Sequence, residues 1–230
     1  MPRIPSHVHA VFFDAVGTLL FPEPSALVIY AEVAQRQGLV LTPAEVRTRF
    51  IRAYRSEEEA DTATGWETSE KREHDRWRRI VTETLAGVSD PESCFNLLFD
   101  HFARPDSWRV ATDAADTLRS LSRGGVKLGI GSNYDNRLWP VLDGFPELTR
   151  LLDHVVISAA VGVRKPGAGF FQHAAQLVGC SVEEMLFVGD DYDNDYLGAT
   201  AAGLSALLLD PHNRYPDVPH RITRLAELVE

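Results

Sequence analysis

The feature that most constrains the fold is an alternation of short apolar segments with helical ones along the second half of the chain. Apolar segments typical of strands occupy residues 126–133, 154–159, 185–191 and 205–210, and helical patterns fill 113–125, 167–179 and 194–203 between them. Such alternation is typical of a parallel sheet with helices on both faces. A further apolar run at 8–13 fits the same sheet, so the sequence predicts an α/β protein with a Rossmann-like core.

A long helical region separates this first strand from the rest. Residues 22–104 carry apolar residues at helical spacing, and Thr42, Pro43 and Glu45 form the pattern of a capped helix start. We therefore predict a core made of residues 1–21 and 105–230, with an inserted all-helical domain over 22–104. The charged stretch 55–61, "RSEEEAD", reads as a solvated helix face rather than a cation site.

Composition excludes several classes of function. The 230 residues carry a net charge of −10, which argues against sequence-independent binding of nucleic acid and gives no reason to expect binding to anionic membranes. The first ten residues lack the apolar stretch of a signal peptide, and no apolar run is long enough to cross a bilayer. The two cysteines lie far apart, in no metal-binding spacing, so we expect a cytoplasmic protein without disulfides. The sequence leaves the oligomeric state open.

Polar side chains follow the apolar segments where each predicted strand ends. Open parallel sheets place ligands at the carboxyl ends of their strands, so we expect these residues to meet at one edge. They are Asp14 and Thr18 after the first strand, Ser132 and Asn133 after the second, Lys165 ahead of a helix after the third, and Asp190 and Asp191 after the fourth.

The charges of this set predict a chemistry. Converging carboxylates of Asp14, Asp190 and Asp195 would repel one another, and Mg²⁺, which prefers oxygen ligands, would relieve the repulsion. Lys165 and the hydroxyl of Ser132 could hold a phosphate dianion beside this cation. Asp14 could then attack phosphorus to form an aspartyl phosphate.

The segments "FDAVGTLL", "GIGSN", "RKPGAGFF" and "VGDDYDNDYLGA" together resemble the four motifs of the haloacid dehalogenase-like hydrolase superfamily, in order and spacing over nearly the whole chain. Residues 22–104 stand where that superfamily carries a helical cap. The resemblance implies that Asp14 is the nucleophile and that Ser132 and Lys165 bind the phosphate and orient the nucleophile. It also implies that Asp190 and the backbone carbonyl of Val16 bind Mg²⁺, with Asp195 or Asp191 completing the shell.

The predicted assignments are therefore as follows. The catalytic residues are Asp14, Lys165 and Ser132; the substrate-binding residues are Thr18, Ser132, Asn133 and Lys165; the metal ligands are Asp14, Val16 through its carbonyl, Asp190 and Asp195. The expected substrate is a small phosphate ester.

The resemblance fails at Val16, because the superfamily's phosphatases have an aspartate at that position. That aspartate protonates the leaving group and later activates water, and valine can do neither. General acid–base catalysis is typically worth about 10²–10⁴-fold, so ordinary alkyl phosphates should react slowly. Glu57, Glu58, His74 or solvent could supply the missing proton.

Three other functions remain open at this point. In 2-haloacid dehalogenases the fourth motif lacks the first aspartate, whereas Asp190 is present here. Phosphonoacetaldehyde hydrolases use a cap lysine, and Lys71, the lysine of this insertion, stands in the charged run "SEKREHDR" typical of a solvated helix face. The site could also have become a binding or regulatory site for a phosphorylated ligand, with Asp14 holding the cation rather than attacking.

Overall fold

The central feature is a six-stranded sheet in the order β5-β4-β1-β6-β7-β8, in which every neighbouring pair is parallel. The structure is a computed structural model and describes residues 4–230. The strands are β1 (Ala10–Phe13), β4 (Lys127–Ser132), β5 (His154–Ile157), β6 (Met185–Gly189), β7 (Ser205–Leu209) and β8 (Arg221–Ile222). The predicted α/β sheet is confirmed.

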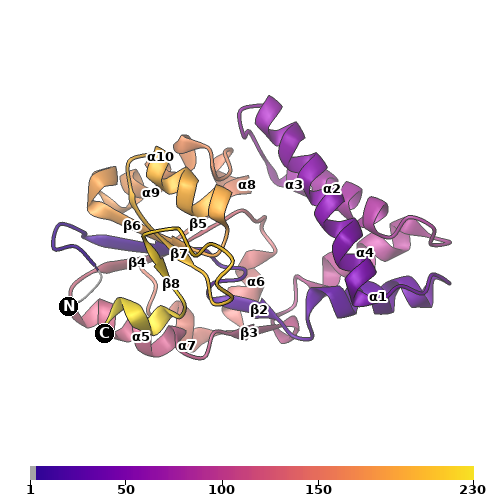
Figure 1. The fold of residues 1–230 in the computed structure, drawn as a ribbon, viewed down its shortest axis with the longest axis horizontal. Helices are drawn as coiled ribbons and strands as arrows, with labels where there is room; N and C mark the ends of the chain where they lie inside the picture. Colours follow the sequence, from indigo (N-terminus) through magenta and orange to yellow (C-terminus); the bar gives the residue numbers. More distant parts are fainter. Residues whose placement is uncertain (1–3) are drawn as a thin grey trace.

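Strand β1 runs through the middle of the sheet and is buried on both sides, which explains its uninterrupted apolar sequence. Val11 and Phe13 point into one hydrophobic core and Ala10 and Phe12 into another, as the two-residue period of a strand requires. Helix α5 (Ala114–Arg123) covers the first core and α9 (Ala168–Val178) the second, so helices lie on both faces (Figure 1).

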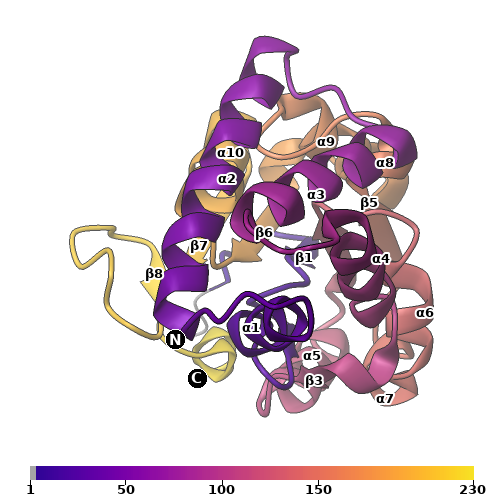
Figure 2. The ribbon, with the colours of Figure 1, turned by 90° about the vertical axis from the view of Figure 1, so that its right-hand side faces the viewer.

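The region between β1 and the remaining core strands forms four helices, which pack together beside the sheet (Figures 1 and 2). They are α1 (Ala26–Arg36), α2 (Pro43–Ala63), α3 (Glu70–Thr84) and α4 (Pro91–His101). The predicted capping box is present: the amide of Glu45 donates to Thr42 Oγ1 at 3.2 Å and the amide of Thr42 donates to Glu45 Oε2 at 2.8 Å. Buried aromatic and aliphatic side chains, including Tyr30 and Phe95, give this region a hydrophobic core of its own.

The chain enters and leaves the helical region through two short paired strands. Strand β2 (Leu20–Pro22) pairs antiparallel with β3 (Trp108–Val110), so the two connections run side by side. The remaining elements are the short helices η1 (Pro105–Ser107), α6 (Leu138–Asp143), α7 (Pro146–Thr149), α8 (Ser158–Val161), η2 (Val182–Glu184), α10 (Gly198–Ala201) and η4 (Leu225–Leu228), with the π-helical turn η3 (Tyr192–Leu197).

The segment predicted as one helix over 194–203 is divided. Residues 192–197 form the π-helical turn and 198–201 a single α-helical turn. The side chain of Asp191 accepts hydrogen bonds from the amides of Asp193 and Asn194, both at 3.0 Å, and so organises the start of the turn. Within residues 4–230, none of the helices combines the length and apolarity needed to cross a membrane.

Candidate active site

The carboxyl ends of β4, β1 and β6 are adjacent in the sheet, and they bring together the residues that the sequence placed at strand ends. Asp14 follows β1, Ser132 ends β4 and Asp190 follows β6. The order of the chain reverses here, since it passes from β1 to β4 and β5 on one side and later to β6 and β7 on the other. Ligands of open α/β sheets bind at this kind of reversal.

Lys165 is the centre of the site. The residue is only 1 % exposed, and its ammonium group donates to Asp14 Oδ1 at 2.6 Å, to Asp195 Oδ1 at 2.7 Å and to the carbonyl oxygen of Gly131 at 2.9 Å. Burial alone would lower the pKa of Lys165, but the two carboxylates outweigh it and hold that pKa above its usual range. Lys165 is therefore a fixed positive charge beside Asp14.

Asn133 holds the backbone of Lys165 in place. Its side-chain amide donates to the Lys165 carbonyl at 2.9 Å, and its side-chain oxygen accepts from the Lys165 amide at 2.8 Å. Both ends of the predicted substrate-binding side chain of Asn133 are thus engaged with the segment that carries the lysine.

The hydroxyl-bearing residues of the predicted set are buried nearby. Ser132 is 2 % exposed and Thr18 is fully buried. The Thr18 hydroxyl has no hydrogen-bond partner among the described residues, although buried hydroxyls are usually paired.

Two glycines permit the close approach of the acidic side chains. Gly17 has φ of +97°, and a β-carbon there would clash with the carboxylate of Asp190. A β-carbon at Gly189 would clash in the same way with the carboxylate of Asp195. Val16, next to Gly17, forms an isolated bridge with Leu20 and packs against the core, so it offers no side-chain chemistry.

Asp14, Asp190 and Asp195 each present an oxygen, and these oxygens lie within 4.8 Å of one another. Burial first, and then the charges of Asp14 and Asp191, raise the pKa of Asp190 to about 7. Burial also raises the pKa values of Asp14 and Asp195, although Lys165 opposes it in both. Clustered carboxylate oxygens that resist ionisation fit a hard divalent cation such as Mg²⁺.

The structure distinguishes the two aspartates left open for the cation's shell. Asp195 lies in the cluster, and its second oxygen accepts the amide of Asp191 at 3.1 Å. The Asp191 side chain instead accepts the amides of its own turn and the side-chain amide of Asn194. Asp195 thus lies in the acidic cluster, and Asp191 supports it through its backbone amide.

Of the three side chains considered as replacements for the missing acid, Glu57 and Glu58 are held in ion pairs and His74 packs against aromatic rings. Burial alone would raise the pKa of Glu57, but hydrogen bonds from Arg79 and Arg72 outweigh it and lower that pKa. His74 stacks edge-on against Phe95, with ring centroids 4.9 Å apart.

Glu58 belongs to a cluster of ion pairs that sequence analysis missed. Helix α2 carries Glu57, Glu58 and Asp61, and these are paired with Arg72, Arg76 and Arg79 of α3 and with Arg164 of the core. Glu57 and Asp61 are buried, so the predicted solvated face of residues 55–61 is wrong for these positions. The signal was present: acids four residues apart on one helix face arginines three and four residues apart on the next.

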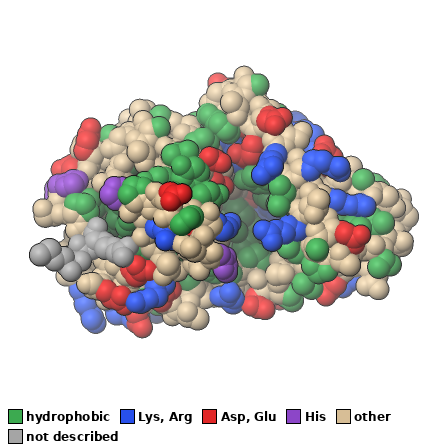
Figure 3. All heavy atoms as spheres, in the orientation of Figure 1, with side chains coloured by type: hydrophobic (Ala, Val, Ile, Leu, Met, Phe, Trp, Pro, Cys, Tyr) green, Lys and Arg blue, Asp and Glu red, His purple; other side chains and the backbone are tan. Residues whose placement is uncertain are grey.

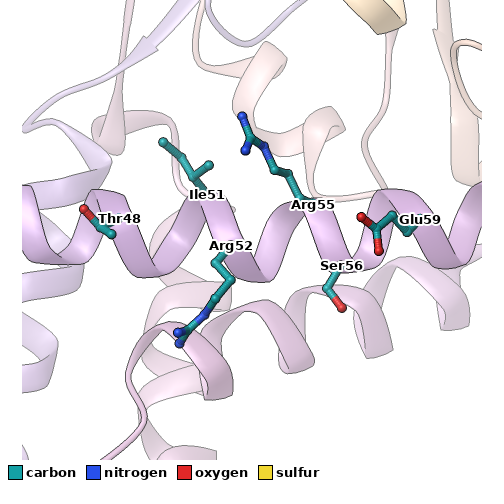
Figure 4. A pocket seen from close by; sticks show the side chains of 6 residues that line it. All are labelled: Thr48, Ile51, Arg52, Arg55, Ser56 and Glu59. Carbon is teal, nitrogen blue, oxygen red and sulfur yellow. The ribbon is translucent and has the colours of Figure 1, made fainter.

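Two of the hollows in the surface of residues 4–230 can be placed relative to the site. One lies between the sheet and the helical region, with acidic and basic side chains around its rim (Figure 3). The other, of about 570 Å³, runs along the outer side of α2, where the side chains of Arg52 and Arg55 point in different directions (Figure 4). The α2 hollow includes none of the clustered polar residues described above.

Comparison with known proteins identifies the family of this chain. The family model for haloacid dehalogenase-like hydrolases matches residues 8–203. The haloacid dehalogenase-like hydrolase domain-containing protein 3 of Danio rerio is 33 % identical over 98 % of this chain and 96 % of its own length. This chain belongs to the haloacid dehalogenase-like hydrolase family.

Proteins named for different reactions are similar to this chain. A glyceraldehyde 3-phosphate phosphatase of Methanothermobacter thermautotrophicus is 29 % identical over 87 % of this chain and 84 % of its own. The L-2-haloacid dehalogenase of Xanthobacter autotrophicus, with 21 % identity, superposes with a TM-score of 0.71 over 90 % of this chain and 79 % of its own. Similarity therefore leaves the reaction open, and the residues of the site must distinguish between a phosphatase and a dehalogenase.

Proposed function

We propose that this hydrolase is a Mg²⁺-dependent phosphatase of small phosphate esters that forms an aspartyl phosphate on Asp14. The observation that carries the proposal is the pair of hydrogen bonds from Lys165 to Asp14 and Asp195, with the carboxylate of Asp190 beside them. One nucleophilic carboxylate, one fixed cation and a clustered acidic set together suit a phosphate dianion.

Each residue of the site has a role in the proposed reaction. One oxygen of Asp14 attacks phosphorus, and the bond from phosphorus to the ester oxygen breaks as the bond to Asp14 forms. Lys165 offsets the negative charge around Asp14 and the phosphate, Ser132 and Thr18 bind phosphate oxygens, and Asn133 holds Lys165 in position. Water then attacks the phosphorus of the aspartyl phosphate and releases inorganic phosphate.

Asp14, Asp190, Asp195 and the carbonyl of Val16 would hold Mg²⁺, which when bound neutralises the carboxylates and the phosphate and polarises the phosphoryl group. We propose that residues 22–104 act as a cap over this site and select the substrate. The free cysteines Cys94 and Cys180 are consistent with a reducing, cytoplasmic setting. The phosphatase relative supports the reaction class.

The missing acid shapes the proposed substrate range. With Val16 in place of an aspartate, the departing oxygen must take its proton from water. Esters whose leaving groups are already good, such as aryl or acyl phosphates, suffer least from this loss.

Two alternatives compete with this proposal. A binding or regulatory site for a phosphorylated ligand is favoured by Val16, because a site without its proton carrier can retain affinity while turnover is lost. Dehalogenation of a 2-haloacid is disfavoured by Asp190, whose negative charge would repel the carboxylate of such a substrate.

The deciding experiment is the hydrolysis of p-nitrophenyl phosphate with Mg²⁺, by the natural protein and by Val16→Asp. We expect turnover that EDTA abolishes, a gain of about 10²-fold or more for Val16→Asp, and a loss of at least about 10⁴-fold for Asp14→Asn. If neither the natural protein nor Val16→Asp turns over while both bind phosphate, the binding-site alternative replaces the phosphatase.

A further inference from the structure

Arg164 joins the sheet domain to the helical region. It immediately precedes Lys165 in the chain, and its side chain is 1 % exposed. Its guanidinium pairs with Asp61 and, at 3.0 Å, with Glu58, both of which lie on α2. A buried charge of the core is therefore neutralised by carboxylates of the cap.

The backbone beside Arg164 is tied to the cap as well. The Arg164 amide donates to the carbonyl oxygen of Trp66 at 3.0 Å, and the Thr68 amide donates to the carbonyl of Gly162 at 3.0 Å. Glu67 and Val163 form an antiparallel bridge between these two bonds. Residues 66–68 of the cap and 162–164 of the core thus pair like a short piece of sheet.

Glycine at position 167 is needed for this contact. A β-carbon there would lie 2.8 Å from the Arg164 carbonyl oxygen and 3.1 Å from the β-carbon of Trp66. The close approach of the two segments is therefore built into the sequence that follows Lys165.

The same cap carboxylate also reaches the loop that carries Asp195. The Asn194 side-chain amide lies 3.4 Å from Glu58 Oε2 and donates to Asp191 Oδ2 at 3.0 Å. The amide of Asp191 in turn donates to Asp195. Two segments that hold active-site groups therefore contact α2 through Glu58.

These contacts make the position of Lys165 depend on the contacts between residues 162–164 and the cap. Withdrawal of the cap would leave Arg164 without its carboxylates, and a buried unpaired charge is strongly unfavourable. Segment 162–165 would have to move to solvate Arg164, and Lys165, one peptide bond away, would be carried with it.

We propose that Arg164 is a positioning residue through which docking of the cap places Lys165 against Asp14. The kinetic part of this inference rests on the proposed phosphatase reaction; the structural coupling does not. Lys165 is correctly placed only while α2 holds Arg164.

Arg72 provides a matched control for removing Arg164. Arg72 also donates to Asp61, but it lies on α3, within the cap. Arg164→Met and Arg72→Met each remove one guanidinium from the same carboxylate, and only Arg164→Met removes a link to the core.

The first measurement is amide hydrogen exchange of the metal-free, full-length variants. We expect Arg164→Met to accelerate exchange at residues 68, 164 and 165 by about 10-fold or more, because their amides bond to Gly162, Trp66 and Asn133. Arg72→Met should leave these amides within about 3-fold of the natural protein. A merely structural role would instead raise exchange throughout α2 and α3.

The second measurement is p-nitrophenyl phosphate turnover, normalised to the folded fraction from circular dichroism. Displacement of a catalytic group by about 1 Å can cost about 10²-fold, so we expect a kcat loss of that order for Arg164→Met. Arg164→Lys, which keeps the charge, should recover part of it, and Arg72→Met should lose less than about 3-fold.

Equal effects of Arg164→Met and Arg72→Met in both measurements, or unchanged exchange at residue 165 in Arg164→Met, would overturn the proposal. If the natural protein hydrolyses no phosphate ester, the proposed function fails alone and exchange still decides the coupling. If Arg164→Met does not fold, Glu58→Gln, which weakens the same link from the cap side, takes its place with the same expected exchange at residues 164 and 165.

Discussion

The core and the cap each bury a cluster of charged side chains, and the two clusters are balanced differently. In the core, Asp14 and Asp195 bond to the ammonium group of Lys165, and the carboxylate of Asp190 lies beside theirs. In the cap, Glu57, Glu58 and Asp61 are paired with the guanidinium groups of Arg72, Arg76 and Arg79, and with that of Arg164, which comes from the core.

The pKa values reflect this difference. Burial and neighbouring negative charge raise the pKa of Asp190 to about 7, whereas paired arginines outweigh burial and lower the pKa of Glu57. The core carboxylates repel one another, and a further cation would offset that repulsion. The cap carboxylates already have arginines as counter-ions. Acidic clusters of similar burial can thus serve a ligand in one place and packing in another.

Removing a charge from the cap cluster should have the largest effect, a loss of folding stability. Asp61→Asn removes the carboxylate shared by Arg72, Arg76 and Arg164, and leaves buried guanidinium groups without their partner. We expect the free energy of unfolding to fall by about 3–5 kcal/mol, measured by urea denaturation. Glu59→Gln, exposed on the same helix, should change it by less than about 0.5 kcal/mol. An unchanged urea midpoint for Asp61→Asn would show that the cap cluster is not a stabilising network.

Substrate preference tests whether the cap supplies the proton that the core lacks. Because the candidate acids of the cap are engaged, p-nitrophenyl phosphate should exceed a sugar phosphate in kcat/KM by about 10²-fold. Steady-state release of inorganic phosphate from both substrates measures this ratio. A ratio near one would mean that some cap group does donate a proton, and Glu58→Gln would then be the first variant to assay.

The smallest expected effect is a gain in folding stability when Asp190 of the core is replaced by asparagine. The raised pKa of Asp190 means that the folded state binds its proton more tightly than the unfolded state, whose pKa is near 3.8. Stability therefore falls as pH rises from about 4 to about 7, and this cost is complete above pH 7. Asparagine at this position does not ionise and avoids the cost.

Metal-free Asp190→Asn should accordingly be more stable than the natural protein at pH 8, by about 2 kcal/mol after allowance for solvent screening, or roughly 4–8 °C in Tm. The difference should disappear near pH 4. Added Mg²⁺ should raise the Tm of the natural protein more than that of the variant. Asp193→Asn, at an exposed position of the same loop, should show neither effect, and a destabilised Asp190→Asn would contradict the charge argument.

Much of the core could be predicted because its signals are local. The alternation of apolar strands and helices set the fold class, and the rule that ligands bind at the carboxyl ends of parallel strands placed Asp14, Ser132 and Asp190 at one edge. The structure places these residues at that edge. It also shows that Asn133 holds the backbone of Lys165 and that Gly17 leaves room for Asp190, both through contacts between segments far apart in the chain.

The cap shows where local signals fail. The charges of residues 55–61 have the same pattern whether the helix face meets water or a second helix, and only the packing of α2 against α3 buries Glu57 and Asp61. The different contacts of Asp191 and Asp195 were also beyond the sequence, because they depend on a π-helical turn that forms where a regular helix was predicted.

The sequence by itself thus determined the sheet, the inserted helices, the acidic strand ends and the valine that replaces a proton carrier, since these follow from residue type, period and order. Tertiary structure alone decided which carboxylates gather around Lys165, which are neutralised by arginines, and that Arg164 joins the cap to the core. Electrostatic energies depend on distances and burial between segments remote in sequence, and those are fixed only when the chain has folded.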